Sequence, residues 1–451
     1  MRTVRIGNGC GFWGDSVDAP VLLAEQGRLD YLTLEYLAEL TMSILALQRQ
    51  KKPEAGYAHD FVTVLGRLAP LLRQQPGLKV ITNAGGMNPA ACAAEARKVL
   101  HQAGLENRKI GVVSGDDLLP HLDALVKNGY PLTNLDTGAP LSEVYGKVVS
   151  ANVYFGARPI VEALQKGAHI VITGRVADAS LTVAPAVYEF GWKWDDWQRL
   201  GAATVAGHLI ECGAQATGGL WTNWRDAPDL ANVGYPIAEM RQDGEFRITK
   251  PTGSGGVVNV ETVTEQLLYE VGDPAAYLTP DVVADFTSVA LRDEGRDVVH
   301  VRTDRGQPAT GSYKVSIAYR DGYAASGTLA IFGENAYQKA HVSGQMILDR
   351  LRRAGFSFAR SHIECIGANA VLAGVVPPPS PQHEVMLRVA VHDPNKAAVD
   401  RFSKEFAPLV TSGLPGTTGY TTGRPQVREV FAYWPALLDK AAVAPRVTVE
   451  G

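Results

Sequence analysis

The sequence has 451 residues, with 43 Lys and Arg against 47 Asp and Glu and a formal net charge of −4 at pH 7. A composition of 46% hydrophobic and 20% charged residues excludes a disordered chain, and the balanced charge argues against nucleic acid or an anionic membrane as a partner. No apolar run reaches about 18 residues, and the start MRTVRIGNGCGFWG contains no apolar signal region, so we expect a cytoplasmic protein without a membrane span.

Strand-like and helix-like segments alternate along the first part of the chain. The predicted strands are 3–7, 29–36, 78–82, 109–113 and 169–173. The predicted helices are 21–26, 38–48, 90–102, one that ends at 128, 154–164 and 181–190. This alternation is typical of βαβ units with a parallel sheet, which binds ligands in the turns at the carboxyl ends of its strands. We therefore predict an α/β domain over 1–284, with glycine-rich ligand-binding turns.

The pattern changes after about residue 285, where alternating segments indicate antiparallel strands. We predict strands at 298–303, 312–320, 324–332, 361–366 and 384–392, and helices at 336–354 and 396–409. Asp321-Gly322 is a typical hairpin turn between two of these strands. The segment 285–451 is therefore predicted to be a smaller α+β domain. Its glycine- and threonine-rich loop 412–425, which contains Arg424, is either a lid over the first domain or a packed structural loop.

The first glycine-rich turn, Gly9–Gly14, matches the pattern G-x-G-x-x-G after a strand, and Glu35 follows about 20 residues later. Such glycines let backbone N–H groups approach a pyrophosphate at a helix N-terminus, which makes an NAD(P) site one hypothesis. The preceding strand is short, and Phe12 and Trp13 are bulky where a phosphate would lie. These features favour a turn that lines a substrate pocket, with Trp13 facing the pocket and Asp15 capping the next helix.

Two further glycine-rich turns are candidate anion sites, because their backbone N–H groups and one lysine could hold a phosphate, a carboxylate or an oxyanion. The alternatives are an ordinary strand-to-helix turn at 83–89 and a flexible loop at 250–256. The residues proposed to bind the anion are Asn83, Gly85, Gly86, Lys250, Gly253, Ser254 and Gly255.

The turn 173–180 follows the last predicted strand of the first domain and carries an arginine and an aspartate. Arg175 offers a planar fork for a carboxylate or phosphate. Asp178 is a candidate catalytic carboxylate, and it could instead pair with Arg175 or cap the following helix.

His208, Glu211 and Cys212 are spaced i, i+3 and i+4 on a predicted helix and therefore share one face. The face offers an acid/base pair and a thiol, and the helix C-terminus disfavours a charged carboxylate, which raises the pKa of Glu211. The alternative is a polar cluster satisfied within the core. We expect no metal site, because no second ligand cluster is evident and the four cysteines form no C-x-x-C pair.

Several of these strings together resemble the acyclic terpene utilisation protein A family. They are GNGCGFWGDS, NAGGMNP, ITGRVADAS, GHLIECGAQATGG, KPTGSGGVVNVETVTEQLLYE, DPAAYLTPDVVADF and TGYTTGRPQVREVFAYWP. The resemblance implies a place in acyclic terpenoid catabolism beside acyl-CoA carboxylases and hydratases. A suggested role is cleavage of a branched 3-hydroxy-3-substituted-glutaryl-CoA or a related hydration, and the resemblance assigns no catalytic residues. Some members carry or neighbour a small ferredoxin-like module, which we do not find here, so we expect a separate small partner.

The function that we predict is a lyase or hydratase acting on a small carboxylate or its CoA thioester, without a firmly implied cofactor. Glu211 and His208 are the candidate acid/base groups, with Asp178 as a competitor, and Arg175 would bind a carboxylate. One alternative is an NAD(P)-dependent oxidoreductase that uses the Gly9–Gly14 turn. Another is a non-catalytic subunit that binds an acyl-CoA or a partner protein. We also expect a homo-oligomer, from the size and type of the protein.

Overall fold

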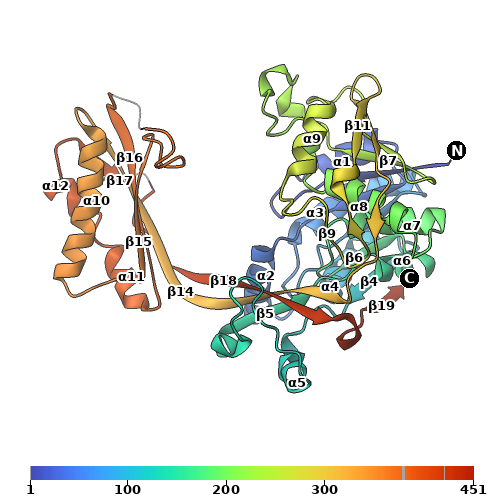
Figure 1. Cartoon of the computed structure of the whole chain (residues 1–451), viewed down its shortest axis with the longest axis horizontal. Coiled ribbons are helices and arrows are strands. Elements are labelled where there is room, and N and C mark those ends of the chain that lie inside the picture. The colour runs from blue at the N-terminus through green and yellow to red at the C-terminus, as the bar shows by residue number, and fades with distance from the viewer. Residues whose placement is uncertain (1, 378–380, 421) are drawn as a thin grey trace. The chain divides into compact units, whose positions relative to one another are not determined.

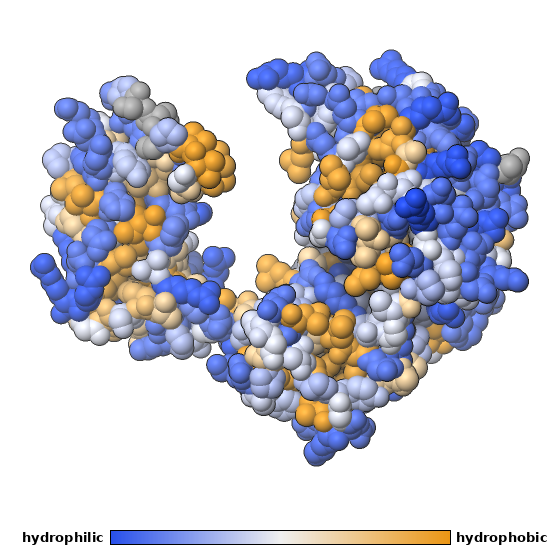
Figure 2. All heavy atoms as spheres, viewed as in Figure 1, coloured by the Kyte–Doolittle hydropathy of each residue, from blue (hydrophilic) through white to orange (hydrophobic). Residues whose placement is uncertain are grey.

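The computed structural model describes residues 2–377, 381–420 and 422–451, which divide into two compact units (Figure 1). The larger unit comprises Met1–Ala318 and Tyr433–Gly451, and the smaller unit comprises Tyr319–Ala432. Within the described ranges no helix is both long and apolar enough to cross a membrane. Hydrophilic residues cover much of the face shown in Figure 2, with smaller hydrophobic areas on each unit.

The larger unit is built on a mixed sheet with the strand order β11-β12-β8-β7-β1-β2-β3-β6-β4-β19 in the described chain. The central strands β1, β2, β3, β6 and β4 pair in parallel, and the flanking strands pair antiparallel. The parallel strands are β1 (Thr3–Asn8), β2 (Tyr31–Leu34), β3 (Lys79–Thr82), β6 (Ile170–Thr173) and β4 (Ile110–Ser114). The flanking strands are β7 (Ile237–Arg241), β8 (Phe246–Thr249), β12 (Val298–Arg302), β11 (Ala290–Asp293) and β19 (Arg446–Glu450).

The sequences of the central strands explain their position. β2 reads YLTL and β6 reads IVIT, and every residue of both strands is buried. Continuous apolar runs rich in β-branched residues are typical of parallel strands that are covered on both faces. The predicted βαβ organisation therefore holds for the centre of this sheet, while its outer strands are antiparallel.

Helices cover both faces of the large sheet. One group, α1 (Ala19–Gln26), α3 (His59–Gln74) and α4 (Pro89–Gln102), packs on one side, and α6 (Arg158–Gln165), α7 (Ser180–Phe190) and α8 (Trp197–Glu211) pack on the other. The remaining elements of the larger unit are α2 (Glu39–Lys51), α5 (Leu122–Lys127), α9 (Val260–Leu268), β5 (Val148–Val153), and a small sheet of β9 (Tyr277–Leu278), β10 (Val283–Ala284) and β13 (Gly306–Gln307).

The predicted domain boundary at 284/285 is wrong, because two later segments of the chain belong to the larger unit. β12 pairs with β8, and β11 pairs with β12, so 290–302 continues the large sheet. β19 pairs antiparallel with β4 and returns the end of the chain to the larger unit. Backbone pairing with distant strands therefore decides the boundary, and the local pattern along the chain does not reveal it.

The smaller unit is an antiparallel sheet with helices, as expected for an α+β fold. Its strand order is β15-β16-β14-β17, and β18 also pairs with β14. Its elements are β14 (Ser312–Phe332), which begins in the larger unit, α10 (Ala336–Arg353), β15 (Arg360–Ile366), β16 (Glu384–Asp393), α11 (Lys396–Phe402), α12 (Leu409–Ser412), β17 (Thr417–Tyr420) and β18 (Arg428–Asp439), which ends in the larger unit. Its core contains Leu329, Ile347, Leu387 and Phe402.

The predicted hairpin at Asp321-Gly322 is wrong, because β14 runs through it as one strand. Pairing with β16 begins at the next residue, where Tyr323 lies opposite Asp393. Gly322 has φ 88°, and a Cβ there would lie 2.8 Å from the Asp393 carbonyl oxygen. The glycine is thus required where the end of β16 approaches β14, and not for a chain reversal.

Candidate functional site

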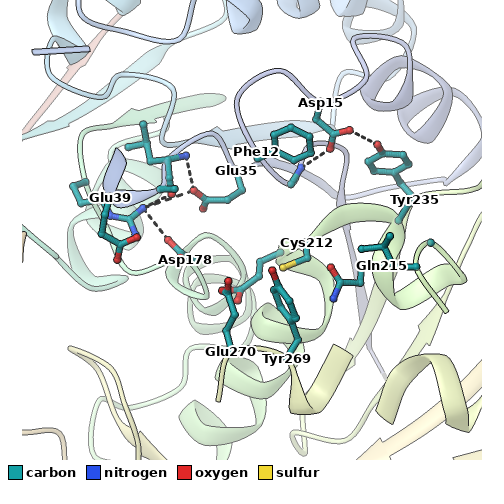
Figure 3. Close-up of a pocket in the computed structure, with 18 residues that line it drawn as sticks. Phe12, Asp15, Glu35, Glu39, Asp178, Cys212, Gln215, Tyr235, Tyr269 and Glu270 are labelled. Carbon is teal, nitrogen blue, oxygen red and sulfur yellow. Dashed lines mark hydrogen bonds and ion pairs between the residues drawn. The ribbon is translucent and has the colours of Figure 1, made fainter. Parts of the chain in front are cut away.

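Two adjoining cavities lie in the larger unit, and the larger of them is drawn in Figure 3. Their volumes are about 540 Å³ and about 350 Å³. We call the joined space the acidic cleft, because four of the five residues that line both cavities are acidic. The shared residues are Glu39, Arg175, Asp178, Glu211 and Glu270.

The acidic cleft is formed where strands end and one helix ends. Asp15 follows β1, Glu35 follows β2 directly, and Arg175 and Asp178 follow β6. Glu211 is the last residue of α8. The carboxyl ends of parallel strands meet at one edge of a sheet, so these side chains converge although they are far apart in the sequence.

Small residues bring α8 close to the turn after β6. A Cβ on Gly207 would lie 2.7 Å from Ala179 Cα, so only glycine allows this approach. The end of α8 is held by Asn8, whose buried side-chain amide donates to the carbonyl oxygens of Ile210 (2.8 Å) and Glu211 (2.9 Å). These contacts satisfy carbonyls that have no partner within the helix and fix Glu211 beside the end of β1.

His208 and Glu211 form a buried hydrogen-bonded pair. Nδ1 of His208 lies 3.1 Å from Glu211 Oε1, and Nε2 lies 2.9 Å from the Gln266 carbonyl oxygen. Because that carbonyl can only accept, Nε2 carries a hydrogen. A hydrogen bond between Nδ1 and Glu211 Oε1 needs a second hydrogen, which is held on one of these two atoms. Burial lowers the pKa of His208, but the hydrogen bond and charge of Glu211 outweigh it and raise the pKa overall. Burial raises the pKa of Glu211.

Arg175 is a buried cation that is already engaged. Its Nη1 donates to the Leu37 carbonyl oxygen at 2.7 Å and lies 2.9 Å from Asp178 Oδ1 and 3.9 Å from Glu35 Oε1. Its guanidinium carbon lies 4.1 Å from the ring centroid of Tyr154. A substrate carboxylate at Nη1 would therefore compete with Asp178, whose side chain is partly exposed.

A second cation, Lys314, faces the acidic cleft from β14. Its Nζ lies 3.0 Å from Glu39 Oε1, which also accepts a hydrogen bond from the Tyr154 hydroxyl at 2.8 Å. Burial raises the pKa of Glu39, but Lys314 and Arg175 outweigh burial and lower the pKa to about 2. Glu39 is therefore ionised at neutral pH. Cys212 also lines the cleft, but burial and Glu211 raise its pKa to about 12, so it is a neutral thiol.

One side of the larger cavity is apolar. Phe12, Leu220 and Tyr269 line it, and 60% of Phe12 and 88% of Leu220 are exposed. Figure 3 shows Phe12 and Tyr269 both away from Glu39, with Phe12 near Asp15 and Tyr269 beside Glu270. Leu220 has φ 61°, a backbone conformation that is unfavourable for a leucine and often marks a functional segment. The cavity thus offers a polar end with carboxyl groups and an apolar end open to solvent.

A family model described as "Acyclic terpene utilisation family protein AtuA" matches residues 4–449 of the chain. The protein belongs to the acyclic terpene utilisation family. This confirms the resemblance found in the sequence, and the family name indicates involvement in acyclic terpene utilisation. No curated protein and no solved structure matches the chain.

The structure of this family protein brings most of the predicted polar groups together. Glu211, Asp178, Arg175 and Asp15 line the larger cavity, and His208 lines the smaller one. Asp15 does not cap α1, because its carboxylate accepts hydrogen bonds from the Gly11 N–H and from the hydroxyl of Tyr235. The catalytic and binding roles of all these residues stay predictions.

The two turns predicted to bind an anion do not line the acidic cleft of the family protein. At 83–89, the Gly86 N–H donates to the Asn83 carbonyl oxygen, and a Cβ on Gly85 would lie 2.5 Å from the Thr173 carbonyl oxygen. At 250–256, the N–H groups of Ser254, Gly255 and Gly256 donate to backbone carbonyls, and Lys250 pairs with Asp297 at 3.2 Å. Gly253 has φ 85° in the same turn. Anion binding there stays a prediction that these bonds argue against.

Two other predicted binding residues are not among those that line the two cavities. Trp13 packs partly buried against the core between the sheet and α1, α3 and α4, and Phe12 faces the cavity in its place. Arg424 is exposed and belongs to the smaller unit, and residue 421 of the predicted lid loop lies outside the described residues. A lid role for that loop stays a prediction.

The G-x-G-x-x-G turn serves packing in the family protein. A Cβ on Gly9 would lie 2.8 Å from Pro20 Cα, and one on Gly11 would lie 2.8 Å from the backbone of Cys212. α1 begins only at Ala19, so the turn does not lead directly into a helix N-terminus as a dinucleotide site requires. Among the described residues no group of three or more His, Cys, Asp and Glu side chains is placed to hold a metal ion.

Sequence reasoning missed several cleft residues: Glu39, Tyr154, Lys314, Tyr269 and Glu270. It considered Glu35 only as a residue that follows the G-x-G-x-x-G pattern of a possible dinucleotide site. A signal was present for Glu35 and Glu39, because Glu35 follows the buried strand β2 directly and Glu39 begins the next helix, at the edge where ligands bind. No local signal marks Lys314, which reaches the cleft from a strand more than 270 residues from its partner Glu39.

Proposed function

We propose that the protein is a lyase or hydratase that acts next to the carbonyl of a small branched carboxylic acid or its CoA thioester. The observation that carries this proposal is the unequal environment of the two Glu211 oxygens. Oε1 shares a proton with His208, whereas Oε2 is buried and has no hydrogen-bond partner within the described chain. Glu211 lines both cavities, so this oxygen is a candidate base.

The proton that the pair holds suits this chemistry. Nε2 of His208 is fixed as a donor by Gln266, so His208 can carry a positive charge beside an ionised Glu211 without leaving the pair. Glu211 Oε2 would then accept the proton from the carbon next to the substrate carbonyl. The electron pair of that C–H bond moves toward the carbonyl oxygen. The electron pair then returns from the oxygen to form a C=C bond as the C–O bond on the next carbon breaks. The departing hydroxyl group takes the proton from Glu211 and leaves as water, and the reverse steps complete a hydration.

The form of the cleft supports the substrate class. The end near Arg175 and Lys314 is polar, and the end near Phe12 and Leu220 is apolar and exposed. A branched acyl chain would cover the exposed apolar residues while its carbonyl lies at the polar end. This arrangement agrees with the family name, since acyclic terpenes are apolar and branched.

The experiment compares wild-type protein with Glu211→Gln, and Glu25→Gln on α1 is the matched control because Glu25 is exposed and lies outside both cavities. A branched 3-hydroxyacyl-CoA, its unsaturated counterpart and the two free acids are incubated in D₂O. Nuclear magnetic resonance measures deuterium at the carbon next to the carbonyl, and absorbance measures the unsaturated thioester.

We expect exchange or turnover by the wild type and by Glu25→Gln, and a loss of at least about 100-fold in Glu211→Gln. Circular dichroism and thermal unfolding should show that all three proteins fold. Full activity of Glu211→Gln would overturn the role of this residue. The absence of both exchange and turnover with all four compounds would overturn the proposed reaction class.

A further inference from the structure

A second carboxyl group in the acidic cleft, that of Glu35, differs from the others in its burial. Only 5% of Glu35 is exposed, although it lines the larger cavity. It follows β2 directly and is labelled in Figure 3, where it lies between Phe12 and the side chain of Glu39. The mechanism proposed above for Glu211 does not use it.

The two oxygens of Glu35 have different partners. Oε1 accepts hydrogen bonds from the Leu37 backbone N–H at 2.9 Å and from the side-chain amide of Asn83. Amide N–H groups can only donate, so Oε1 is held as an acceptor. Oε2 is buried and has no hydrogen-bond partner within the described chain. A proton on Glu35 therefore belongs on Oε2.

The charges around Glu35 favour this protonated form. The nearest cation is Arg175, whose Nη1 lies 3.9 Å from Glu35 Oε1 but only 2.9 Å from Asp178 Oδ1. Burial and the charge of Asp178 raise the pKa of Glu35 well above its ordinary range, more than Arg175 and the hydrogen bonds from Asn83 and Leu37 lower it. An ionised Glu35 would leave Oε2 as a buried charged oxygen without a partner.

We propose that Glu35 is a second catalytic residue, a neutral carboxylic acid whose Oε2–H donates a hydrogen bond to the carbonyl oxygen of the substrate acyl group. This inference rests on the proposed function. When Glu211 takes the proton next to the carbonyl, the electron pair of the C–H bond moves onto the carbonyl oxygen. The Glu35 hydrogen bond stabilises that negative oxygen, and the proton stays on Glu35 throughout.

Asn83 is then a positioning residue. Its side-chain amide donates to Glu35 Oε1, and its own Oδ1 accepts the Tyr36 backbone N–H at 2.8 Å. The second bond fixes which end of the amide faces Glu35. Asn83 thereby keeps Glu35 Oε1 as an acceptor and leaves Oε2 as the donor. This positioning role differs from the anion binding that the sequence predicts for Asn83.

The protonation is tested without substrate, by infrared difference spectroscopy of the wild type against Glu35→Gln at pH 7. The variant is close in shape, and its amide oxygen can accept from Leu37 and Asn83 while its NH₂ group takes the position of Oε2. We expect the difference spectrum to contain the carbonyl stretch of a protonated carboxylic acid. The Glu25→Gln control should lack this band, because Glu25 is exposed. A carboxylate band in place of the acid band would overturn the proposal.

The catalytic role is tested by the deuterium exchange described above, with Glu35→Leu and Glu35→Gln. Removal of the donor should lower exchange about 100-fold in Glu35→Leu, whereas Glu35→Gln keeps a donor and should retain more of the rate. A rate of Glu35→Leu within a few-fold of the wild type would overturn the role. If Glu35→Leu does not fold, a Glu35→Gln rate equal to that of Glu211→Gln would overturn hydrogen-bond donation.

The two proposals can fail separately. A wild type that catalyses no exchange or turnover refutes the reaction class and, with it, the catalytic part of this inference. The infrared band still decides whether Glu35 is neutral. Conversely, an active wild type with an ionised Glu35 leaves the role of Glu211 intact and refutes only the role of Glu35.

Discussion

The turns that follow the strands of the large sheet fall into two kinds. After β2 and β6, side chains point into the acidic cleft, and Glu35, Arg175 and Asp178 line it. The turns after β3 and β8 are rich in glycine, and several of their N–H groups donate to backbone carbonyls. Neighbouring atoms occupy the Cβ positions of Gly85, Gly86, Gly255 and Gly256, whereas no atom lies within 4 Å of that position at Gly253. The side-chain turns therefore hold the chemical groups, and the glycine turns hold the neighbouring backbone close.

This difference between the two kinds of turn shows how an excess of glycine at strand ends is to be interpreted. A glycine that is needed for a ligand leaves open space above its backbone, as in phosphate-binding loops. At Gly85 and Gly255, that space contains the backbone atoms of Thr173 and Asp229. The glycines thus indicate the correct edge of the sheet, but the groups that bind and react are in the adjacent turns.

The largest effect on stability is expected at Arg175, in the side-chain turn after β6. Arg175→Met leaves Asp178 without the Arg175 cation. Removing one partner of a fully buried pair costs about 3–5 kcal/mol, and because 35% of the Asp178 side chain is exposed we expect a loss near the lower value. Urea unfolding at pH 7 should show this loss, and the loss should become smaller as the pH falls, because burial raises the pKa of Asp178 and the protonated carboxyl needs no cation. Lys98→Met on α4 is the control, because its ion pair with Glu95 at 2.7 Å is exposed and should contribute at most about 1 kcal/mol. Equal losses in both variants would contradict the buried pair.

The next effect concerns Asp116, which holds the same turn. Its Oδ2 accepts hydrogen bonds from the Arg175 backbone N–H and from the Asn152 amide, both at 2.9 Å. Burial nevertheless raises the pKa of Asp116 from 3.8 to about 6. Between these values the folded protein keeps a proton that the unfolded chain has released, so the free energy of unfolding falls as pH rises.

Asp116→Asn cannot lose this proton and should not show that part of the decline. From pH 4 to pH 7, its stability relative to the wild type should therefore increase by roughly 3 kcal/mol or less. Unfolding in urea at several pH values measures the difference. Parallel curves for the two proteins would show that Asp116 is ionised in the folded protein over this whole range.

Much of the fold was predictable, because it is encoded locally. The parallel strands and their helices follow from apolar runs of four or five residues that alternate with helical segments, as at 170–173 and 180–190. α3 was missed, although Phe61, Leu65, Leu68 and Leu72 mark one buried helical face. The antiparallel edges and β14 were not predictable in the same way, since their pairing joins distant segments.

The site was predictable where its residues share one helix or one turn. His208 and Glu211 are three residues apart, and Arg175 and Asp178 are likewise three apart, so their spacing alone predicts a contact. The contact between Lys314 and Glu39 depends on how β14 passes the cleft, which no local pattern encodes. Trp13 and Phe12 show the same limit within one turn, because the backbone conformation decides which ring faces the cavity.

A smaller effect on stability is expected in the glycine turn after β3. In Gly85→Ala, the new Cβ would lie 2.5 Å from the Thr173 carbonyl oxygen and 2.8 Å from Pro89 Cα, so backbone must move. Overpacking of this kind costs about 1–3 kcal/mol. Gly77→Ala is the control, because no atom lies within 4 Å of its Cβ position. Unchanged thermal unfolding of Gly85→Ala would show that the turn has open space, as an anion site would require.

The smallest effect is expected at Phe12, whose turn combines both kinds. Gly9 and Gly11 pack against backbone, but the exposed Phe12 ring lines the cavity. Phe12→Ala should hardly change stability, whereas it removes apolar contact worth about 1 kcal/mol and should raise KM about fivefold for a long branched acyl chain. For a short acyl chain KM should stay the same. Leu40→Ala is the control, since Leu40 is similarly exposed at 64% and lies outside both cavities. If KM changes equally for both chain lengths, the apolar end does not bind the chain, and the turn after β1 belongs with the packing turns.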